Sequence, residues 1–447
     1  MTAVIFWFRK DLRTDDHPSL NMALSSGGDV YCVATADQLG ARFEALSTLR
    51  QNSLRASWEQ LSKSLDSKLS ILESPNQVTR LAAALQVNKV FVSEVFDTNG
   101  TKELLAVEKD LAENGVQLIR GPGNYAVTPG TVRKKDGTPY RVYTPFFNEW
   151  SKHQMGNPVK RSGLESLKPV PDELLKFHPH FEMGNGVIAG EKHAIKTLSR
   201  FIESRISGYS ESRNRADLGG TSHLSHALSH GEIHPRTILA ALPEGLGAEV
   251  FRKEIAWREF YADVLYHRPD SLTEYLEPRF ATMRYNQPSE LLEAWKFGRT
   301  GFPMVDAGMR QLLETGWMHN RVRMIVASFL VKDLHLEWQL GAEWFEQNLS
   351  DFDPASNSHG WQWTAGCGTD ASPYYRIFNP VSQGHKFDPN GDYVRKFIPE
   401  LKHLNGSAAL EPWDHEHGYS FGYPKRIVDH AEERLEALAR LEELKTL

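Results

Sequence analysis

The chain has 447 residues, of which 40% are hydrophobic, so it can form two or three domains with ordinary buried cores. Its formal net charge of −6 excludes a generally basic coat, and any surface that binds nucleic acid must therefore be a local positive patch. With only two cysteines, a disulfide framework and a cysteine-rich metal site are excluded, and we expect no bound metal.

The first eight residues are apolar, but Arg9, Lys10 and Asp11 interrupt them at once. This pattern is typical of a first strand and not of a secretory signal. No apolar run approaches the ~18 residues that indicate a membrane span. We therefore expect a cytoplasmic protein without a membrane partner.

Residues 1–127 alternate short β-branched or apolar runs with helical patterns. The expected strands are Val4–Phe8, Val30–Ala34, Leu69–Leu72, Lys89–Ser93 and Val116–Ile119, and the clearest helices between them are Arg42–Leu65 and Thr101–Glu113. This order predicts an α/β domain with a parallel, doubly wound sheet covered by helices. Because no Gly-x-Gly-x-x-Gly follows the first strand, we expect no dinucleotide in this domain.

The rest of the chain loses its strand signals. Residues 128–190 are rich in proline and weakly periodic, which predicts an interdomain connector. Residues 191–447 have helical periodicity and predict an all-helical second domain. At its end, four leucines predict an amphipathic helix that docks on this domain, because their repeat is too short for a stable coiled coil. They are Leu435, Leu438, Leu441 and Leu444.

Residues 298–376 concentrate polar and aromatic side chains. Read as a helix, the segment after His319 places Asn320, Arg323, Met324 and Ala327 on one face. A stripe that faces water would be more uniformly charged, and a core stripe more uniformly apolar. This face therefore suits a polar heterocycle that lies against an apolar surface.

Three motifs in this region closely resemble the photolyase/cryptochrome family, and most closely its class I cyclobutane pyrimidine dimer photolyases. They are Gly301–Leu312, Trp317–Met324 and Trp361–Trp363. The resemblance covers nearly the whole chain, with the motifs in order. It implies an antenna-type α/β domain, a helical domain that binds FAD, and light-driven repair of ultraviolet-damaged DNA by a protein that is usually monomeric.

The resemblance assigns a set of cofactor-binding residues. Hydroxyls and free backbone N–H groups at a helix start suit phosphate oxygens, although Thr-Ser pairs more often simply cap helices. An Arg–Asp pair among these residues could equally be a plain structural ion pair. The expected FAD contacts are Tyr209, Thr221, Ser222, His223, Leu224, Ser225, Arg258, Arg323, Asp351, Asp353 and, facing flavin N5, Asn357.

A second set is assigned to the damaged DNA. Glu254, Trp257, Arg258 and Tyr261 share one helical face by their spacing. The resemblance implies that Glu254 hydrogen-bonds the dimer, that Trp257 and Trp363 stack on it, and that Asn320 and Met324 complete the pocket. Core filling is the alternative role for both tryptophans. The expected phosphate contacts, which carry no sequence information, are Arg213, Lys253, Arg321 and Arg376.

The implied reaction is electron transfer from photoexcited reduced FAD to a dimer flipped out of the duplex, as photolyases do. The expected catalytic residues are Glu254, Asn320, Met324 and Asn357, and Asn357 favours repair because many signalling cryptochromes carry Asp or Cys there. Two alternatives stay open: a flavin blue-light photoreceptor (cryptochrome) without repair activity, and a dark flavin oxidoreductase.

Two finer expectations concern light harvesting and flavin photoreduction. Relatives that bind a folate carry an acidic residue where Gly100 stands, so we favour 8-hydroxy-5-deazaflavin over methenyltetrahydrofolate as antenna, with an empty site as an open alternative. Trp361 and Trp338 match the proximal and middle members of the family's tryptophan chain. The distal place falls on Tyr285, with Trp344 or Trp295 as substitutes.

Overall fold

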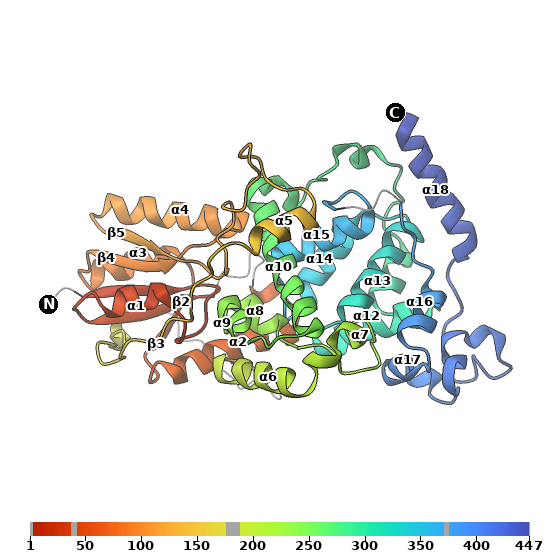
Figure 1. Cartoon of the computed structure of the whole chain (residues 1–447), viewed down its shortest axis with the longest axis horizontal. Helices are drawn as coiled ribbons and strands as arrows, with labels where there is room; N and C mark the ends of the chain where they lie inside the picture. The colour runs from red at the N-terminus through yellow and green to blue at the C-terminus, as the bar shows by residue number, and fades with distance from the viewer. Residues whose placement is uncertain (1–2, 37–42, 176–187, 371–374, 447) are drawn as a thin grey trace. The chain divides into compact units, whose positions relative to one another are not determined.

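The computed structural model of this chain describes residues 3–36, 43–175, 188–370 and 375–446 (Figure 1). The chain divides into two compact units. The first comprises Met1–Tyr140, Thr144–Ser207 and Ser222–Pro269, and the second comprises Arg141–Tyr143, Gly208–Thr221 and Asp270–Leu447. Two short segments of the second unit therefore interrupt the first unit in sequence.

The first unit contains a five-stranded parallel sheet in the order β3-β2-β1-β4-β5. Its strands are β1 Val4–Phe8, β2 Val30–Thr35, β3 Leu69–Leu72, β4 Lys89–Ser93 and β5 Gln117–Gly121. The predicted parallel sheet is thus confirmed, although β5 begins one residue later and ends two residues later than the sequence indicated. Strands β1 to β4 are short and rich in buried apolar residues, as expected for strands covered on both faces, whereas the edge strand β5 is largely half-buried.

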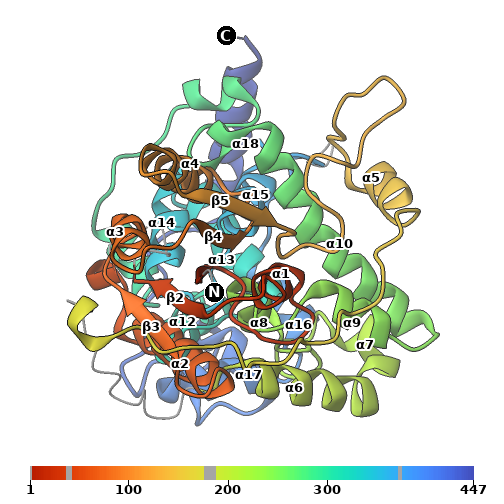
Figure 2. The same ribbon diagram turned by 90° about the vertical axis from the view of Figure 1, so that its left-hand side faces the viewer.

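The alternation of β1 explains why helices cover both faces of the sheet (Figure 2). Phe6 and Phe8 pack into one buried cluster, and Ile5 and Trp7 pack into the other. The first cluster includes side chains of α1 (Pro18–Leu24) and α2 (Thr48–Ser64), and the second includes side chains of α3 (Asn76–Ala84) and α4 (Thr98–Glu113).

Capping side chains explain why two helices begin elsewhere than the sequence predicted. Helix α2 starts at Thr48 because the Ser47 hydroxyl accepts a hydrogen bond from Arg50 N, and Arg42, the predicted start, lies outside the described residues. Helix α4 starts at Thr98, three residues early, because the Asp97 carboxylate accepts from Gly100 N at 2.9 Å.

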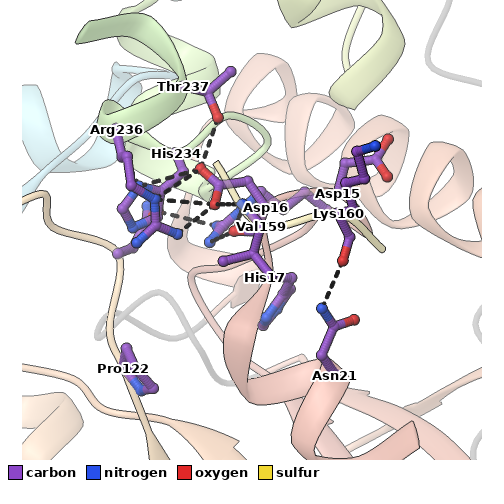
Figure 3. A network of polar contacts seen from close by, with 12 residues as sticks. Asp15, Asp16, His17, Asn21, Pro122, Val159, Lys160, His234, Arg236 and Thr237 are labelled. Atoms are coloured by element: carbon purple, nitrogen blue, oxygen red, sulfur yellow. Dashed lines mark hydrogen bonds and ion pairs between the residues drawn. The ribbon is translucent and has the colours of Figure 1, made fainter. Parts of the chain in front are cut away.

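A buried carboxylate ties three distant parts of the first unit together (Figure 3). Asp16 accepts hydrogen bonds from Val159 N at 2.8 Å and from the Thr237 hydroxyl at 2.7 Å, and it pairs with the Arg236 guanidinium. Asn21 adds a bond from its amide to the Lys160 carbonyl at 2.9 Å. Residues 159–160 of the predicted connector are therefore held against the segment that follows β1.

Further helices of the first unit lie after residue 190, and one of them, α10, carries part of the predicted site. They are α6 Glu191–Ser204, α8 Ser225–His230, α9 Pro235–Ala241 and α10 Leu246–His267. Helix α5, Tyr143–Trp150, precedes them. On α10, buried Glu259 accepts hydrogen bonds from Ala126 N, Val127 N and Trp150 Nε1, so one face of this helix is occupied by the chain's own groups.

The regular elements of the second unit are helices among its described residues, in agreement with the helical C-terminal part that the sequence predicted. Its α-helices are α7 Tyr209–Ser212, α11 Glu290–Lys296, α12 Pro303–Thr315, α13 Asn320–Lys332, α14 Trp338–Asn348, α15 Pro354–Ala365, α16 Pro380–Phe387, α17 Asp392–Phe397 and α18 His430–Thr446. Val322, Val326 and Phe329 of α13 are wholly buried in its hydrophobic core. Searched over the described residues, the molecule has no helix with the length and apolarity of a membrane span.

The C-terminal helix α18 forms as predicted, but its leucine stripe is only partly buried. Leu444 is buried, whereas Leu435 is 64% exposed and Leu438 is 37% exposed. The helix is held by Leu444 and Leu441, which pack in and against the core, by Arg440, which donates to the Arg284 carbonyl at 2.7 Å, and by ion pairs from Arg284. The prediction that these four leucines form the docking face is therefore wrong for its first half.

Candidate functional site

Helix α13 presents the polar face that the sequence predicted. It begins at Asn320 because the His319 ring nitrogen Nδ1 accepts from Arg321 N at 3.1 Å. Its apolar side lies in the core of the second unit, whereas Asn320 is exposed and Arg323 and Met324 are half-buried. The amide, the guanidinium and the thioether thus lie where a ligand can reach them.

Arg323 and Asp351 form an ion pair at the edge of this face. The guanidinium donates to Asp351 Oδ2 at 2.7 Å and to the Met318 carbonyl at 2.8 Å. The Asp351 side chain is only 1% exposed, and its other oxygen, Oδ1, has no hydrogen-bond partner among the described residues. A buried carboxylate oxygen without a donor is costly, which makes Oδ1 a ready acceptor for an N–H group of a ligand.

Helix α15 holds the next residues of the predicted cofactor set. Asp353 caps it by accepting from Ser356 N at 2.7 Å. Asn357 Nδ2 donates to the Ala342 carbonyl on α14 at 3.0 Å, which fixes the plane of the amide. The following residues, Ser358 and His359, are buried in the helix, so this part of the chain is not a loop.

His359 fits the core because it is neutral. Its Nδ1–H donates to the Ala355 carbonyl at 2.8 Å, and Nε2 accepts from the Ser271 hydroxyl, 2.9 Å away. Burial lowers the pKa of His359 to about 4, so the imidazole carries no charge at neutral pH.

The segment around α7 lies against the start of α13. The Arg321 guanidinium donates to Asn214 Oδ1 from Nε at 3.2 Å and from Nη2 at 2.8 Å. It also lies 4.6 Å from the centre of the Phe387 ring. Tyr209 is buried, and the Arg213 guanidinium lies 5.9 Å from its ring centre. The structure thus brings Tyr209, Arg213 and Arg321 into one region of the second unit, and Asn214 was missed because an isolated amide carries no sequence signal.

The indoles of Trp361 and Trp338 are both buried, and neither Nε1–H finds an acceptor among the described residues. One helical turn beyond Trp338, Gly341 packs so closely on Trp361 that a Cβ there would lie 2.1 Å from the ring. Trp295 also contacts Trp361, with ring centres 6.1 Å apart, but it is wholly buried and donates to the Val326 carbonyl.

A cavity of about 150 Å³ in the second unit is lined by aromatic and basic side chains. Trp363, Tyr375, Arg376 and Lys332 are among its walls. The Lys332 ammonium donates to the Arg376 carbonyl and lies 4.2 Å from the centre of the Tyr375 ring. Burial lowers the pKa of Lys332 to about 7. Two residues predicted to contact DNA, Trp363 and Arg376, therefore share one cavity.

In the first unit, α10 confirms the predicted helix that carries Glu254, Trp257, Arg258 and Tyr261, and all four are half-buried. The rings of Trp257 and Tyr261 lie 5.4 Å apart. Arg258 donates to the Asn124 and Leu228 carbonyls, at 3.1 and 3.3 Å, and its buried Nε has no partner among the described residues.

Helix α8 begins at Ser225, where the sequence predicted a helix start, but it spans only six residues. Its N-cap is Leu224, whose own N–H is bonded to the Ser222 hydroxyl at 3.3 Å. His223 has a positive φ of 55°. Ser222–Ser225 lie in the first unit, whereas Thr221, Tyr209 and the α13 residues lie in the second.

Asp97 and Gly100, which belong to the loop expected near an antenna, serve the start of α4. Besides capping the helix, Asp97 pairs with Lys10 at 3.2 Å. A Cβ at Gly100 would lie 2.8 Å from Asp97 Oδ2, so a larger residue would disturb this cap. The local contacts thus account for both residues without an antenna.

The chain is similar to known proteins over nearly its whole length. A family model described as DNA photolyase matches residues 4–169, and one described as the FAD binding domain of DNA photolyase matches residues 251–443. Among curated relatives, proteins named deoxyribodipyrimidine photo-lyase from Alkalihalophilus pseudofirmus and Escherichia coli are 37% and 35% identical. The first match covers 97% of this chain and 96% of the relative, and the second covers 99% of each.

Two solved structures are also similar to this chain over nearly its whole length. A bacterial class III photolyase from Agrobacterium tumefaciens has a TM-score of 0.89 at 34% identity, covering 100% of this chain and 98% of its own. A cryptochrome from Synechocystis has a TM-score of 0.86 at 26% identity, covering 98% and 99%.

Proposed function

Because the chain belongs to the DNA photolyase family, we propose that it uses light to split cyclobutane pyrimidine dimers in DNA. The family resemblance of the motifs is thereby confirmed, and the chain is an enzyme of the deoxyribodipyrimidine photo-lyase type. The observation that carries the proposal is the extent of the similarity, which covers 97% of this chain and 96% of a relative with that name.

The residues of this region fit FAD. The match to the FAD binding domain covers α13 and α15, where the buried Asp351 Oδ1 has no donor among the described residues, and a flavin ring N–H would provide one. We propose that Arg323, Asp351, Asp353 and Asn357 hold the flavin ring and the adjoining sugar. The remaining proposed contacts hold the phosphates and the rest of the cofactor, namely Tyr209, Thr221, Ser222, His223, Leu224, Ser225 and Arg258.

When bound and reduced, FAD would supply the photoexcited electron that opens the cyclobutane ring of a flipped-out dimer. The protein's own part is orientation and charge. Arg323, paired with Asp351, keeps a positive charge beside the ring without leaving either charge unpaired in the interior. Asn357, whose amide plane is fixed by the Ala342 carbonyl, offers a neutral donor and acceptor.

For the lesion, we propose that Glu254 hydrogen-bonds a pyrimidine carbonyl and that Trp257 and Trp363 stack on the dimer, since stacking tolerates any base sequence. Asn320 and Met324 would form the remaining edge. The exposed Arg376 and the half-buried Arg213 and Arg321 are proposed phosphate contacts, which position the DNA without reading its sequence. The protein would act as a monomer.

An antenna of the 8-hydroxy-5-deazaflavin type remains part of this proposal, because Gly100 stands where relatives that bind a folate carry an acidic residue. The second candidate function is a blue-light photoreceptor. It is favoured by the structural similarity to the Synechocystis cryptochrome.

A repair assay separates the candidates. Purified protein, reconstituted with FAD and reduced with dithionite, is incubated with a thymine-dimer oligonucleotide under blue light, in darkness, and in darkness with NADPH. Restoration of the thymines only in light is expected. Binding of FAD without repair would point to a photoreceptor, and repair in darkness with NADPH would point to an oxidoreductase.

A further inference from the structure

Tyr275 contacts both the second and the third member of the predicted electron path. Its ring centre is 6.1 Å from that of Trp338, in an edge-on arrangement, and 6.3 Å from that of Tyr285, with the two phenol rings nearly parallel. All three residues belong to the second unit. A phenol that sequence spacing did not indicate is therefore in ring contact with both members.

The two phenols differ in what accepts their protons. The Tyr275 hydroxyl donates to Glu337 Oε1 at 3.2 Å, and the Glu337 side chain is exposed at the start of α14. The Tyr285 hydroxyl donates to the Phe280 carbonyl at 3.2 Å. A carboxylate is a base that can take up a proton and return it to water, whereas a peptide carbonyl is not.

Because both phenols are largely shielded from water, the group that accepts the proton determines which of them can be oxidised. Burial raises the pKa of both Tyr275 and Tyr285, so each is a neutral phenol before oxidation. A buried phenol that loses an electron must also lose its proton, because a buried, unpaired positive charge is strongly unfavourable. Only Tyr275 has a carboxylate at its hydroxyl.

Trp338 cannot fulfil the same role. Its indole Nε1–H is buried and has no acceptor among the described residues, so an oxidised Trp338 has no local base to take its proton. The positive charge therefore stays mobile on Trp338 until a neighbour can be oxidised with release of a proton. Tyr275 is in ring contact with Trp338 and meets this requirement.

We propose that Tyr275 and Glu337 together form the terminal electron donor for flavin photoreduction, an inference that rests on the proposed function. The oxidant would be the Trp338 radical cation, which a bound, photoexcited oxidised flavin would generate by taking up one electron through Trp361. One electron passes from Tyr275 to Trp338, the phenolic O–H bond breaks, and a new O–H bond forms on the Glu337 carboxylate. The products are neutral Trp338, a neutral tyrosyl radical and a protonated Glu337.

Transient absorption after a blue flash on oxidised, FAD-bound protein tests this assignment. Tyr275→Phe keeps the ring and removes the hydroxyl, and it should abolish the tyrosyl signal while a tryptophan radical still forms. Tyr285→Phe is the matched control and should retain the signal. Glu337→Gln should greatly reduce the tyrosyl yield, whereas Glu343→Gln, an exposed glutamate on the same helix, should not.

Three outcomes would overturn the proposal: a tyrosyl signal that survives Tyr275→Phe, one that is lost in Tyr285→Phe, or one unaffected by Glu337→Gln. A wild-type protein that forms no tyrosyl radical would overturn it as well. Far-ultraviolet circular dichroism and flavin absorbance establish that each variant is folded.

Dimer repair by dithionite-reduced protein separates this result from the proposed function. Chemical reduction bypasses the electron path, so Tyr275→Phe and Glu337→Gln should then repair as well as the wild type. If the reduced wild type fails to repair, the proposed function fails, while the flash experiment still decides the role of Tyr275.

Discussion

The Arg323 guanidinium lies 2.7 Å from Asp351 Oδ2, while Oδ1 of the same buried carboxylate has no partner among the described residues. This half-satisfied pair is the clearest sign in the second unit of a ligand with an N–H donor. Breaking it should therefore affect both the fold and the cofactor.

Asp351→Asn keeps the size of the side chain and removes its charge. We expect the free energy of unfolding to fall by about 1–3 kcal/mol, since the half-buried guanidinium loses its counter-ion. We also expect the purified protein to retain less flavin, measured as the ratio of visible to ultraviolet absorbance. The matched control is Asp392→Asn, which breaks the exposed pair with Arg395 and should change stability by less than about 1 kcal/mol. Full flavin content in Asp351→Asn would contradict the assignment.

Asn357→Asp replaces an amide that donates to the Ala342 carbonyl with a carboxylate that repels it. At pH 8 the free energy of unfolding of the flavin-free protein should fall by about 1–3 kcal/mol, so its unfolding midpoint in urea should be lower. The loss should be smaller at pH 5, where the new carboxyl can be protonated and donate. Repair under blue light should also be impaired. An unchanged midpoint at both pH values would show that this hydrogen bond is not formed.

Glu254→Gln removes an ionisable group from the half-buried face of α10. If Glu254 stabilises the reduced dimer, the yield of repair per absorbed photon should fall while flavin content stays the same. Glu249→Gln, on the same helix and exposed, is the matched control. Equal repair yields and dimer affinities in the two variants would remove Glu254 from the chemistry.

His359 makes the fold sensitive to acid. Its pKa is about 4 in the folded protein and about 6.5 in the unfolded chain, so its contribution to stability is fully present above pH 6.5 and is lost as the pH falls through 4. His359→Gln removes this titration. The difference in unfolding free energy between pH 7 and pH 4.5 should then be smaller by roughly 2–3 kcal/mol than in the wild type. The same pH dependence in both proteins would contradict the buried neutral imidazole.

The elements of the site were predictable from the sequence wherever a local pattern determines them. The continuous apolar run Val4–Phe8 indicated a strand, and helical spacing placed Glu254 with Trp257 and Asn320 with Met324 on common faces. In each case the structure confirms the element, because the pattern of burial repeats with the period of the backbone. The roles of these residues stay predictions.

Contacts between segments far apart in the chain could not be predicted from the sequence. Tyr275 meets Trp338, and Asn214 meets Arg321, through packing that no spacing rule encodes. Leu435 and Leu438 continue the leucine repeat of α18, yet they are exposed, whereas Leu441 and Leu444 pack against the core of the second unit. Which leucines of the repeat find a partner therefore depends on segments far away in the chain.

The central claim is that a bound flavin drives the repair, and an action spectrum tests it most directly. The rate of thymine-dimer repair by dithionite-reduced, FAD-bound protein is measured at a series of wavelengths with equal photon flux. We predict that the rate follows the absorption spectrum of the reduced flavin and is zero in darkness. Repair at a rate independent of wavelength, or no repair at any wavelength by a fully flavin-loaded protein, would contradict the account.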